Sequence, residues 1–252
     1  MLERDVLVNF LETELQASTI RDYCPNGLQV EGKSSIKKLV TGVTASQAFL
    51  DAAVAAGADA ILVHHGYFWK NEPYPVTGIK KRRLQTLLNN DINLIAYHLP
   101  LDVHPLIGNN ARLGAMLAVQ NITAITSAEP RGVLMQGDMA TATELAVISA
   151  HLAKQLGREP LTHDAGIGLV TKIAWCTGGG QSYIEQAAAA GAQLFVSGEV
   201  SEQTIHLSRE LGIHFIAAGH HATERYGVKA LGELIAERFA LDVQFIDIDN
   251  PA

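Results

Sequence analysis

Histidines and carboxylates in this chain collect directly after three segments with the apolar pattern of buried strands. In folds that alternate strands and helices, the loops beyond the carboxyl ends of strands carry the functional side chains. The three segments therefore predict a site rich in imidazole and carboxylate groups. They are the strand 60–63 followed by His64 and His65, the strand 92–97 followed by His98 and Asp102, and the strand 213–217 followed by His220 and Glu224.

The spacing of these side chains suits more than one divalent metal ion. Adjacent side chains on an extended backbone point to opposite sides, so His64 and His65 favour two ions, or one ion and a group behind it. His220 and Glu224 stand at i and i+4 and would face the same way on a helix. Asp102 and Glu224 supply anionic charge, and a carboxylate can bridge two cations. Imidazole with carboxylate favours zinc, iron, manganese or cobalt over calcium or magnesium.

A histidine at a strand end can also do no more than satisfy a backbone carbonyl. The clustering at three strand ends favours a metal site over that explanation. Five further histidines lack such a context and are expected to be surface or packing residues; they are His104, His151, His163, His206 and His214. The only two cysteines, Cys24 and Cys176, are far apart in sequence. A disulfide framework or thiolate zinc finger is therefore excluded, and a metal must use histidine and carboxylate.

The elements that position these residues alternate between strands and helices, which predicts an α/β fold with mixed sheets covered by helices. The order of elements also occurs twice. A helix, a glycine stop and a strand around Gly57 recur around Gly191, an offset of 134 residues. The same offset places Glu199 at the strand end equivalent to His65, so Glu199 is a candidate for proton transfer. The sequence therefore predicts a duplicated fold of two similar halves.

The composition agrees with a globular chain of two such halves. With 252 residues, 48% hydrophobic and 18% charged, it has the material for a buried core and a length between one and two domains. The predicted halves are residues 1–126 and 127–252, joined in the turn-rich segment 127–132, with the last helix and strand expected to pack on the first half. A net charge of -7 disfavours duplex nucleic acid as a partner.

The chain shows no signal for a membrane or an organic cofactor. It has no apolar run long enough to span a bilayer and begins with acidic residues, so cytoplasm is the expected compartment. A glycine turn at 177–182 resembles an anion-binding loop but lacks the spacing of nucleotide-binding motifs, and a tight turn explains it equally well. The basic run 80–83 is typical of a solvated helix face.

Six short motifs, taken together and in order, resemble the family of GTP cyclohydrolase type 2 homologues, also called the NGG-interacting-factor-like family. The resemblance covers nearly the whole chain and is strongest to the short bacterial form, which lacks an inserted middle domain. The motifs are Asn-Gly-Leu-Gln-Val-Glu-Gly at 26–32, Thr-Gly-Val-Thr at 41–44, His-His-Gly at 64–66, His-Leu-Pro-Leu-Asp at 98–102, Gly-Glu at 198–199 and Gly-His-His-Ala-Thr-Glu at 219–224.

The resemblance implies a duplicated α/β fold of two intertwined halves, a toroidal homohexamer and a dinuclear metal site in each subunit that faces the inner cavity. Carried onto matching positions, it implies that Glu224 bridges both ions and that His98 is a further ligand or lies just behind the ligands. The remaining ligands implied are His64, His65, Asp102 and His220.

The function implied by the resemblance is a hydrolase that opens the imidazole ring of GTP or a related purine. Divalent ions lower the pKa of water, which suits hydrolysis of a nucleotide-like substrate. His98 is the first candidate for proton transfer, because imidazole titrates near neutral pH, and Glu199 is the second. The alternative is a non-catalytic metal-binding ring or scaffold with an interaction or metal-sensing role. A scaffold site would be closed by protein ligands, whereas an enzyme keeps a coordination position open.

Overall fold

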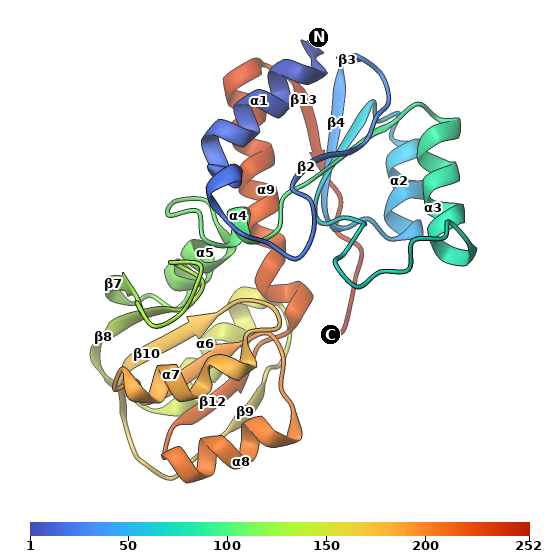
Figure 1. Ribbon diagram of the computed structural model, residues 1–252. Coiled ribbons are helices and arrows are strands. Elements are labelled where there is room, and N and C mark those ends of the chain that lie inside the picture. The colour runs from blue at the N-terminus through green and yellow to red at the C-terminus, as the bar shows by residue number, and fades with distance from the viewer. The chain divides into compact units, whose positions relative to one another are not determined.

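A computed structural model describes residues 1–252, which form two compact units (Figure 1). The first unit comprises residues 1–101 and 227–249, and the second comprises 102–226 and 250–252. No helix of the chain has both the length and the apolar character required to cross a membrane.

The first unit contains a five-stranded sheet and a separate two-stranded one. The sheet order is β13-β4-β5-β6-β2, in which β2 alone runs antiparallel to its neighbour. The elements of the first unit are β1 (Leu2–Glu3), α1 (Arg4–Leu15), β2 (Gly27–Val30), β3 (Ser35–Ile36), β4 (Lys38–Thr44), α2 (Gln47–Ala55), β5 (Ala60–His65), α3 (Gly78–Asn89), β6 (Asn93–Ala96), the larger part of α9 (His220–Phe239) and β13 (Asp242–Phe245).

Helices cover both faces of this sheet (Figure 1). On one face, Phe49 of α2 and Leu87 of α3 pack with Ile61 and other strand residues in a single apolar cluster. On the other face lie α1 and α9, whose Phe10 and Phe239 rings meet edge to face at 5.1 Å. The parallel strands are therefore buried on both sides, which is why they read as continuous apolar runs in the sequence.

The second unit is built on a six-stranded sheet. Its order is β7-β8-β10-β11-β12-β9, with β10, β11 and β12 parallel. Its elements are α5 (Asn109–Met116), β7 (Gln120–Ala124), β8 (Met135–Thr143), α6 (Leu145–Leu156), β9 (Leu161–His163), β10 (Val170–Cys176), α7 (Ile184–Ala189), β11 (Leu194–Ser197), α8 (Glu202–Leu211), β12 (His214–Ala217) and the start of α9, while α4 (Leu99–Asp102) ends at the boundary.

Alternate residues of the central strands supply two separate cores in this unit. Ile173 and Trp175 of β10 pack with Leu152 of α6 and with α5, whereas Ala174 and Cys176 pack with α7 and α8. This alternation with a period of two buries both faces of the sheet under helices. The predicted mixed α/β class is thereby confirmed.

The two sheets repeat one topology, as the duplication predicts. In each unit three parallel strands follow one another through helices, and an antiparallel strand that comes earlier in the chain pairs with the third. The pair Val40 and Ile61 in the first sheet corresponds to Ala174 and Phe195 in the second, and both members are shifted by the same 134 residues.

The boundary between the two units differs from the one expected. The chain passes to the second unit after Leu101, not at 126/127, because α5 packs in the second core and β7 pairs with β8. The segment 127–132 is the loop of this hairpin, not a junction between halves. Helix α6 begins only at Leu145, because Thr143 still pairs with Val170. Strand β8 is half-exposed at the sheet edge and lacks the apolar signal of a buried strand.

Asp59, just before β5, fixes the start of the neighbouring strand. It is 8% exposed and accepts hydrogen bonds from Lys33 Nζ at 2.6 Å and from the backbone amides of Lys37 and Lys38 at 2.8 and 3.1 Å. Burial alone would raise the pKa of Asp59, but these hydrogen bonds and the Lys33 charge outweigh burial and lower it below its ordinary value of 3.8. The ionised carboxylate therefore stabilises the first sheet.

We expect Asp59→Asn to lower the free energy of unfolding at pH 7 by about 1 to 3 kcal/mol, since a charge-assisted network is weakened. A depressed pKa contributes stability above the ordinary value of 3.8, and that contribution is lost as the pH falls through the folded-state pKa. Urea unfolding followed by circular dichroism should therefore show the gap to the wild type closing in acid. The exposed Asp51→Asn on α2 is the control, and an equal loss there would contradict the assignment.

Candidate metal centre

Three histidines of the first unit gather at the carboxyl ends of β5 and β6. His64 and His65 end β5, and His98 follows β6. The ring centroid of His64 lies 4.5 Å from that of His65 and 5.0 Å from that of His98. One ligand atom from each ring lies within 4.8 Å of the others, so the three could hold a metal ion. The expectation that His64 and His65 point apart is wrong, because their rings converge at the strand end.

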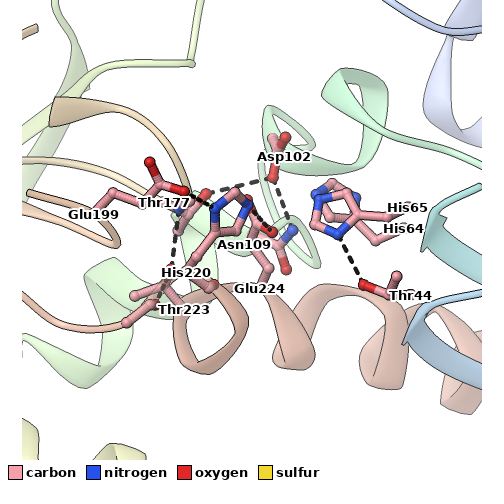
Figure 2. Close-up of polar contacts among 12 residues, drawn as sticks. Thr44, His64, His65, Asp102, Asn109, Thr177, Glu199, His220, Thr223 and Glu224 are labelled. Carbon is pink, nitrogen blue, oxygen red and sulfur yellow. Dashed lines mark hydrogen bonds and ion pairs between the residues drawn. The ribbon is translucent and has the colours of Figure 1, made fainter. Parts of the chain in front are cut away.

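Hydrogen bonds at Nδ1 set the direction of the two β5 rings. His64 is fully buried, and its Nδ1 lies 3.0 Å from the carbonyl oxygen of Tyr97. A carbonyl oxygen can only accept, so Nδ1 carries the proton and Nε2 presents the lone pair. The Nδ1 of His65 lies 3.0 Å from the hydroxyl of Thr44 at the end of β4 (Figure 2). Each ring is thus tied to a different neighbouring strand.

His98 is held by Asp22, which the sequence did not indicate. Its Nδ1 donates to Asp22 Oδ1 at 2.8 Å, and its backbone amide donates to Asn26 Oδ1 at 2.8 Å. The other carboxylate oxygen of Asp22 accepts from the Leu99 amide and the Asn26 side chain, both at 2.9 Å. Burial would raise the pKa of Asp22, but the hydrogen bond and charge of His98 lower it. Asp22 is therefore an anion that fixes the ring and tautomer of His98.

Cys24 also lies beside this pair, with its sulfur within 4.8 Å of ligand atoms of Asp22 and His98. Burial and the Asp22 charge raise the pKa of the Cys24 thiol to about 12. This thiol therefore stays protonated at neutral pH when no cation lies beside it. The donor groups that the first unit brings together at the strand ends are the three imidazoles.

In the second unit, His220 and Glu224 occupy the first turn of α9 and face one another, as the i, i+4 spacing predicts. His220 Nε2 lies 3.0 Å from Glu224 Oε2, and its Nδ1 lies 2.7 Å from Glu199 Oε1 (Figure 2). Burial would lower the pKa of His220, but the hydrogen bonds and charges of Glu224 and Glu199 raise it to about 9. This position therefore stabilises positive charge.

Asp102 is a buried carboxylate in the same unit and is 5% exposed. Its Oδ1 accepts from Asn109 Nδ2 at 2.8 Å and from Thr177 Oγ1 at 3.4 Å (Figure 2). Neither partner was expected from the sequence, because they come from α5 and from the loop after β10. Glu199, the second candidate for proton transfer, lies against His220 and orients its ring.

The glycine turn after β10 makes room for Glu224. Gly178 has a φ of +61°, and a Cβ on it would lie 1.9 Å from Glu224 Oε1. Its amide donates to Thr223 Oγ1 at 3.0 Å, which joins the turn to the first turn of α9. The turn leads into a 3-10 turn that continues directly into the six-residue α7. Close packing against a carboxylate thus explains Gly178, whereas a Cβ on Gly180 would overlap the sulfur of Cys176.

The remaining histidines belong to packing or surface positions. His214 is 1% exposed and accepts at Nδ1 from the Ala165 amide, with Nε2 near the Gly168 carbonyl. His163 contacts the hydroxyl of Ser208, His151 contacts the carbonyl oxygen of Met116, and His206 is exposed. His104 lines a cavity of the second unit.

We expect Gly178→Ala to destabilise the protein more than Gly191→Ala does. Both glycines have positive φ, so both variants carry about 1 kcal/mol of backbone strain. Nothing lies within 4 Å of a Cβ at Gly191, whereas a Cβ at Gly178 overlaps Glu224 and adds about 1 to 3 kcal/mol. Equal losses in urea unfolding would show that Gly178 is not required to accommodate Glu224.

Each unit offers one donor set suited to divalent ions. The first supplies imidazoles, and the second supplies two carboxylates and an imidazole. In His64 the Nδ1 atom faces a carbonyl oxygen, which leaves Nε2 as the ligating nitrogen. In His220 Nδ1 is held by Glu199, and Nε2 faces the Glu224 carboxylate, where a metal ion would take the place of the proton between them. Metal-binding histidines in proteins are oriented in this way. The residues present therefore fit divalent metal ions.

Comparison with known proteins gives one family over the whole chain. A family model described as Duf34/NIF3 (NGG1p interacting factor 3) matches residues 2–251. A Pseudomonas aeruginosa protein named GTP cyclohydrolase 1 type 2 homolog is 56% identical over 246 residues, with 98% of this chain and 97% of the relative covered. A Yersinia pestis protein of the same name is 58% identical, with 98% of both chains covered.

Solved structures agree with this result. A structure described as protein ybgI, of unknown function, matches with a TM-score of 0.95 at 51% identity and covers 100% of both chains. The protein TTHA1606 from Thermus thermophilus matches with a TM-score of 0.90 at 36% identity, again over 100% of both chains. The resemblance carried by the six motifs is confirmed, and the chain belongs to the Duf34/NIF3 (NGG1p interacting factor 3) family.

Proposed function

We propose that this chain is a metal-dependent hydrolase that holds two divalent ions and acts on a nucleotide-like substrate, GTP or a related purine. The observation that carries the proposal is the Nδ1 hydrogen bond of the buried His64, which aims Nε2 of that ring as a ligand. The proposed ligands are His64, His65, Asp102, His220 and Glu224, with Glu224 shared by both ions. The ions are zinc, iron, manganese or cobalt.

The charges of the donor groups support this ligand set. Neutral imidazoles offset none of the charge of two divalent ions, whereas Asp102 and Glu224 supply two negative charges. Both carboxylates are almost completely buried, at 5% and 3% exposure. Burying a carboxylate is costly unless it is hydrogen-bonded or faces a cation. Bound divalent ions supply Lewis acidity, which stabilises negative charge that develops during hydrolysis.

The other side chains hold protons and orient the ligands. Asp22 keeps the proton of His98 on Nδ1, so Nε2 is the basic nitrogen and can take a proton during hydrolysis. Glu199 accepts from Nδ1 of His220 and holds that ring in place. We therefore assign His98 to proton transfer and Glu199 to positioning, a narrower role than the sequence suggested for Glu199.

The substrate class rests on the names of the relatives, which are called homologs of a GTP cyclohydrolase. Opening a purine imidazole ring requires water and proton transfer, which suits imidazole beside divalent ions. The resemblance also predicts a homohexameric ring with its site facing inward, and this assembly stays a prediction. A metal-binding scaffold without catalysis is the competing function.

Glu224→Gln should reduce the metal content of the protein, because an amide neither neutralises nor bridges two cations as a carboxylate does. Protein purified from metal-supplemented cells should carry two ions per chain by elemental analysis, and the variant should carry fewer and lose hydrolysis. Glu233→Gln lies on the exposed side of the same helix and is the matched control. Two ions retained in the Glu224 variant would overturn its bridging role.

Metal-loaded protein should convert GTP, or another purine nucleotide of a panel, into a ring-opened product that is detected by chromatography and mass spectrometry. Protein treated with a chelator should be inactive, and readdition of the metal should restore turnover. Absence of turnover across the panel, with both ions retained, would favour the scaffold function.

A further inference from the structure

The second unit contains a cavity of about 570 Å³ that neither the ligand set nor the proton-transfer residues explain. Three segments form it: the loop that follows α4, the helix α5 and the hairpin β7–β8. Its volume lies within the range of about 300 to 1,000 Å³ of small-molecule sites. Asp102, one of the proposed metal ligands, is among its lining residues.

The walls of the cavity are mostly apolar. Val103, Ile122, Ala124 and Met135 line it from the loop and from both strands of the hairpin. Ile122 is 42% exposed. An exposed apolar concavity with a few polar groups is the usual form of a site for a planar organic group.

Arg131 supplies a positive charge at this cavity. It is exposed, and no carboxylate of the protein forms an ion pair with it. A guanidinium group binds phosphate or carboxylate through paired hydrogen bonds. His104, another lining residue, accepts the amides of Leu106 and Ile107 at Nδ1, which places its ring proton on Nε2. The polar groups of the cavity thus include the Arg131 guanidinium, a donor suited to an anion.

Hydrogen bonds of the Asn110 side chain hold the wall of the cavity in place. The side-chain amide of Asn110 donates to the carbonyls of Gly132 and Val133 at 2.9 and 3.0 Å, and its Oδ1 accepts from the Thr177 amide at 3.1 Å. Gly132 has a φ of +96°, and a Cβ there would lie 3.2 Å from Val103. The hairpin loop, α5 and the Thr177 turn that contacts Asp102 are therefore connected before a ligand binds.

We propose that this cavity binds the nucleotide-like substrate, with its heteroaromatic base against the apolar wall and an anionic substituent at Arg131, which places the substrate beside Asp102. The substrate class rests on the proposed function, whereas the location rests on the cavity. One unit of the duplicated chain would thereby supply most of the contacts with the substrate. These contacts come from α5 and from the hairpin β7–β8, and the first sheet has no hairpin at the equivalent edge.

A pair of substitutions on α5 tests the location. Ala111 lines the cavity, whereas Ala115 lies one helical turn further on and is exposed outside it. In isothermal titration of the metal-loaded protein with GTP, Ala111→Trp should weaken binding about tenfold or more, because the ring fills the cavity. Ala115→Trp should bind GTP as the wild type does. Equal affinity of Ala111→Trp and the wild type, or no binding of GTP to the wild type, would overturn the proposal.

Arg131→Gln tests the anionic contact without filling the cavity, and as an exposed substitution it should leave folding unchanged. It should weaken GTP binding about tenfold while leaving the affinity for guanosine within about twofold of the wild type, since guanosine lacks phosphate. Equal losses for GTP and guanosine, or no loss for GTP, would overturn the role of Arg131.

The cavity and the hydrolase proposals fail in different ways. If the wild type binds GTP without converting it, and Ala111→Trp weakens that binding, the cavity proposal stands and the hydrolase proposal falls. Turnover that continues unchanged in Ala111→Trp would leave the hydrolase standing and remove the cavity as the substrate site.

Discussion

The hydrogen bond between a histidine Nδ1 and a fixed oxygen is the interaction on which the candidate metal centre depends. His64 shows this most clearly, because its partner is the backbone carbonyl of Tyr97. The Tyr97 amide donates in turn to the Val63 carbonyl at 3.1 Å, so the register between β5 and β6 sets where that acceptor lies. A slip of one residue would turn the buried His64 to the other face of the sheet. The pairing of β5 with β6 thus determines the direction in which Nε2 of His64 points.

The duplicated topology explains how one chain provides two different donor sets. The offset of 134 residues that aligns the sheets places Gly178 at the position of Thr44 and Glu199 at that of His65. In the first unit the Thr44 hydroxyl meets His65. In the second unit the glycine leaves the space that the Glu224 carboxylate occupies. Equivalent backbone positions therefore lie beside a candidate imidazole ligand in one half and a candidate carboxylate ligand in the other.

The sequence predicted the residues whose positions follow from local structure, such as His64 at a strand end and the facing pair of His220 and Glu224. Such positions can be predicted because the apolar pattern shows where each strand ends and a glycine shows where several helices end. The sequence did not reveal residues whose role depends on long-range contacts. Asp22, for example, is separated from His98 by 76 residues and lies in a turn, so no periodic pattern links the two. The hairpin β7–β8 was missed for another reason, since a half-exposed edge strand carries little apolar signal. Tertiary packing, rather than local propensity, decides these features.

The cost of the buried carboxylates indicates that this part of the second unit is organised for charge rather than for stability. Asp102 and Glu224 are close enough to Cys176 to raise the pKa of its thiol further, after burial has raised it most. The same carboxylate, Glu224, together with Glu199, raises the pKa of His220 to about 9. A fold selected for stability alone would place apolar side chains at such positions, because burying charge is unfavourable. The interior of this region is electrostatically negative, and hydrogen bonds from Asn109 and Thr177 hold the Asp102 carboxylate in place. Such a region favours the binding of a cation.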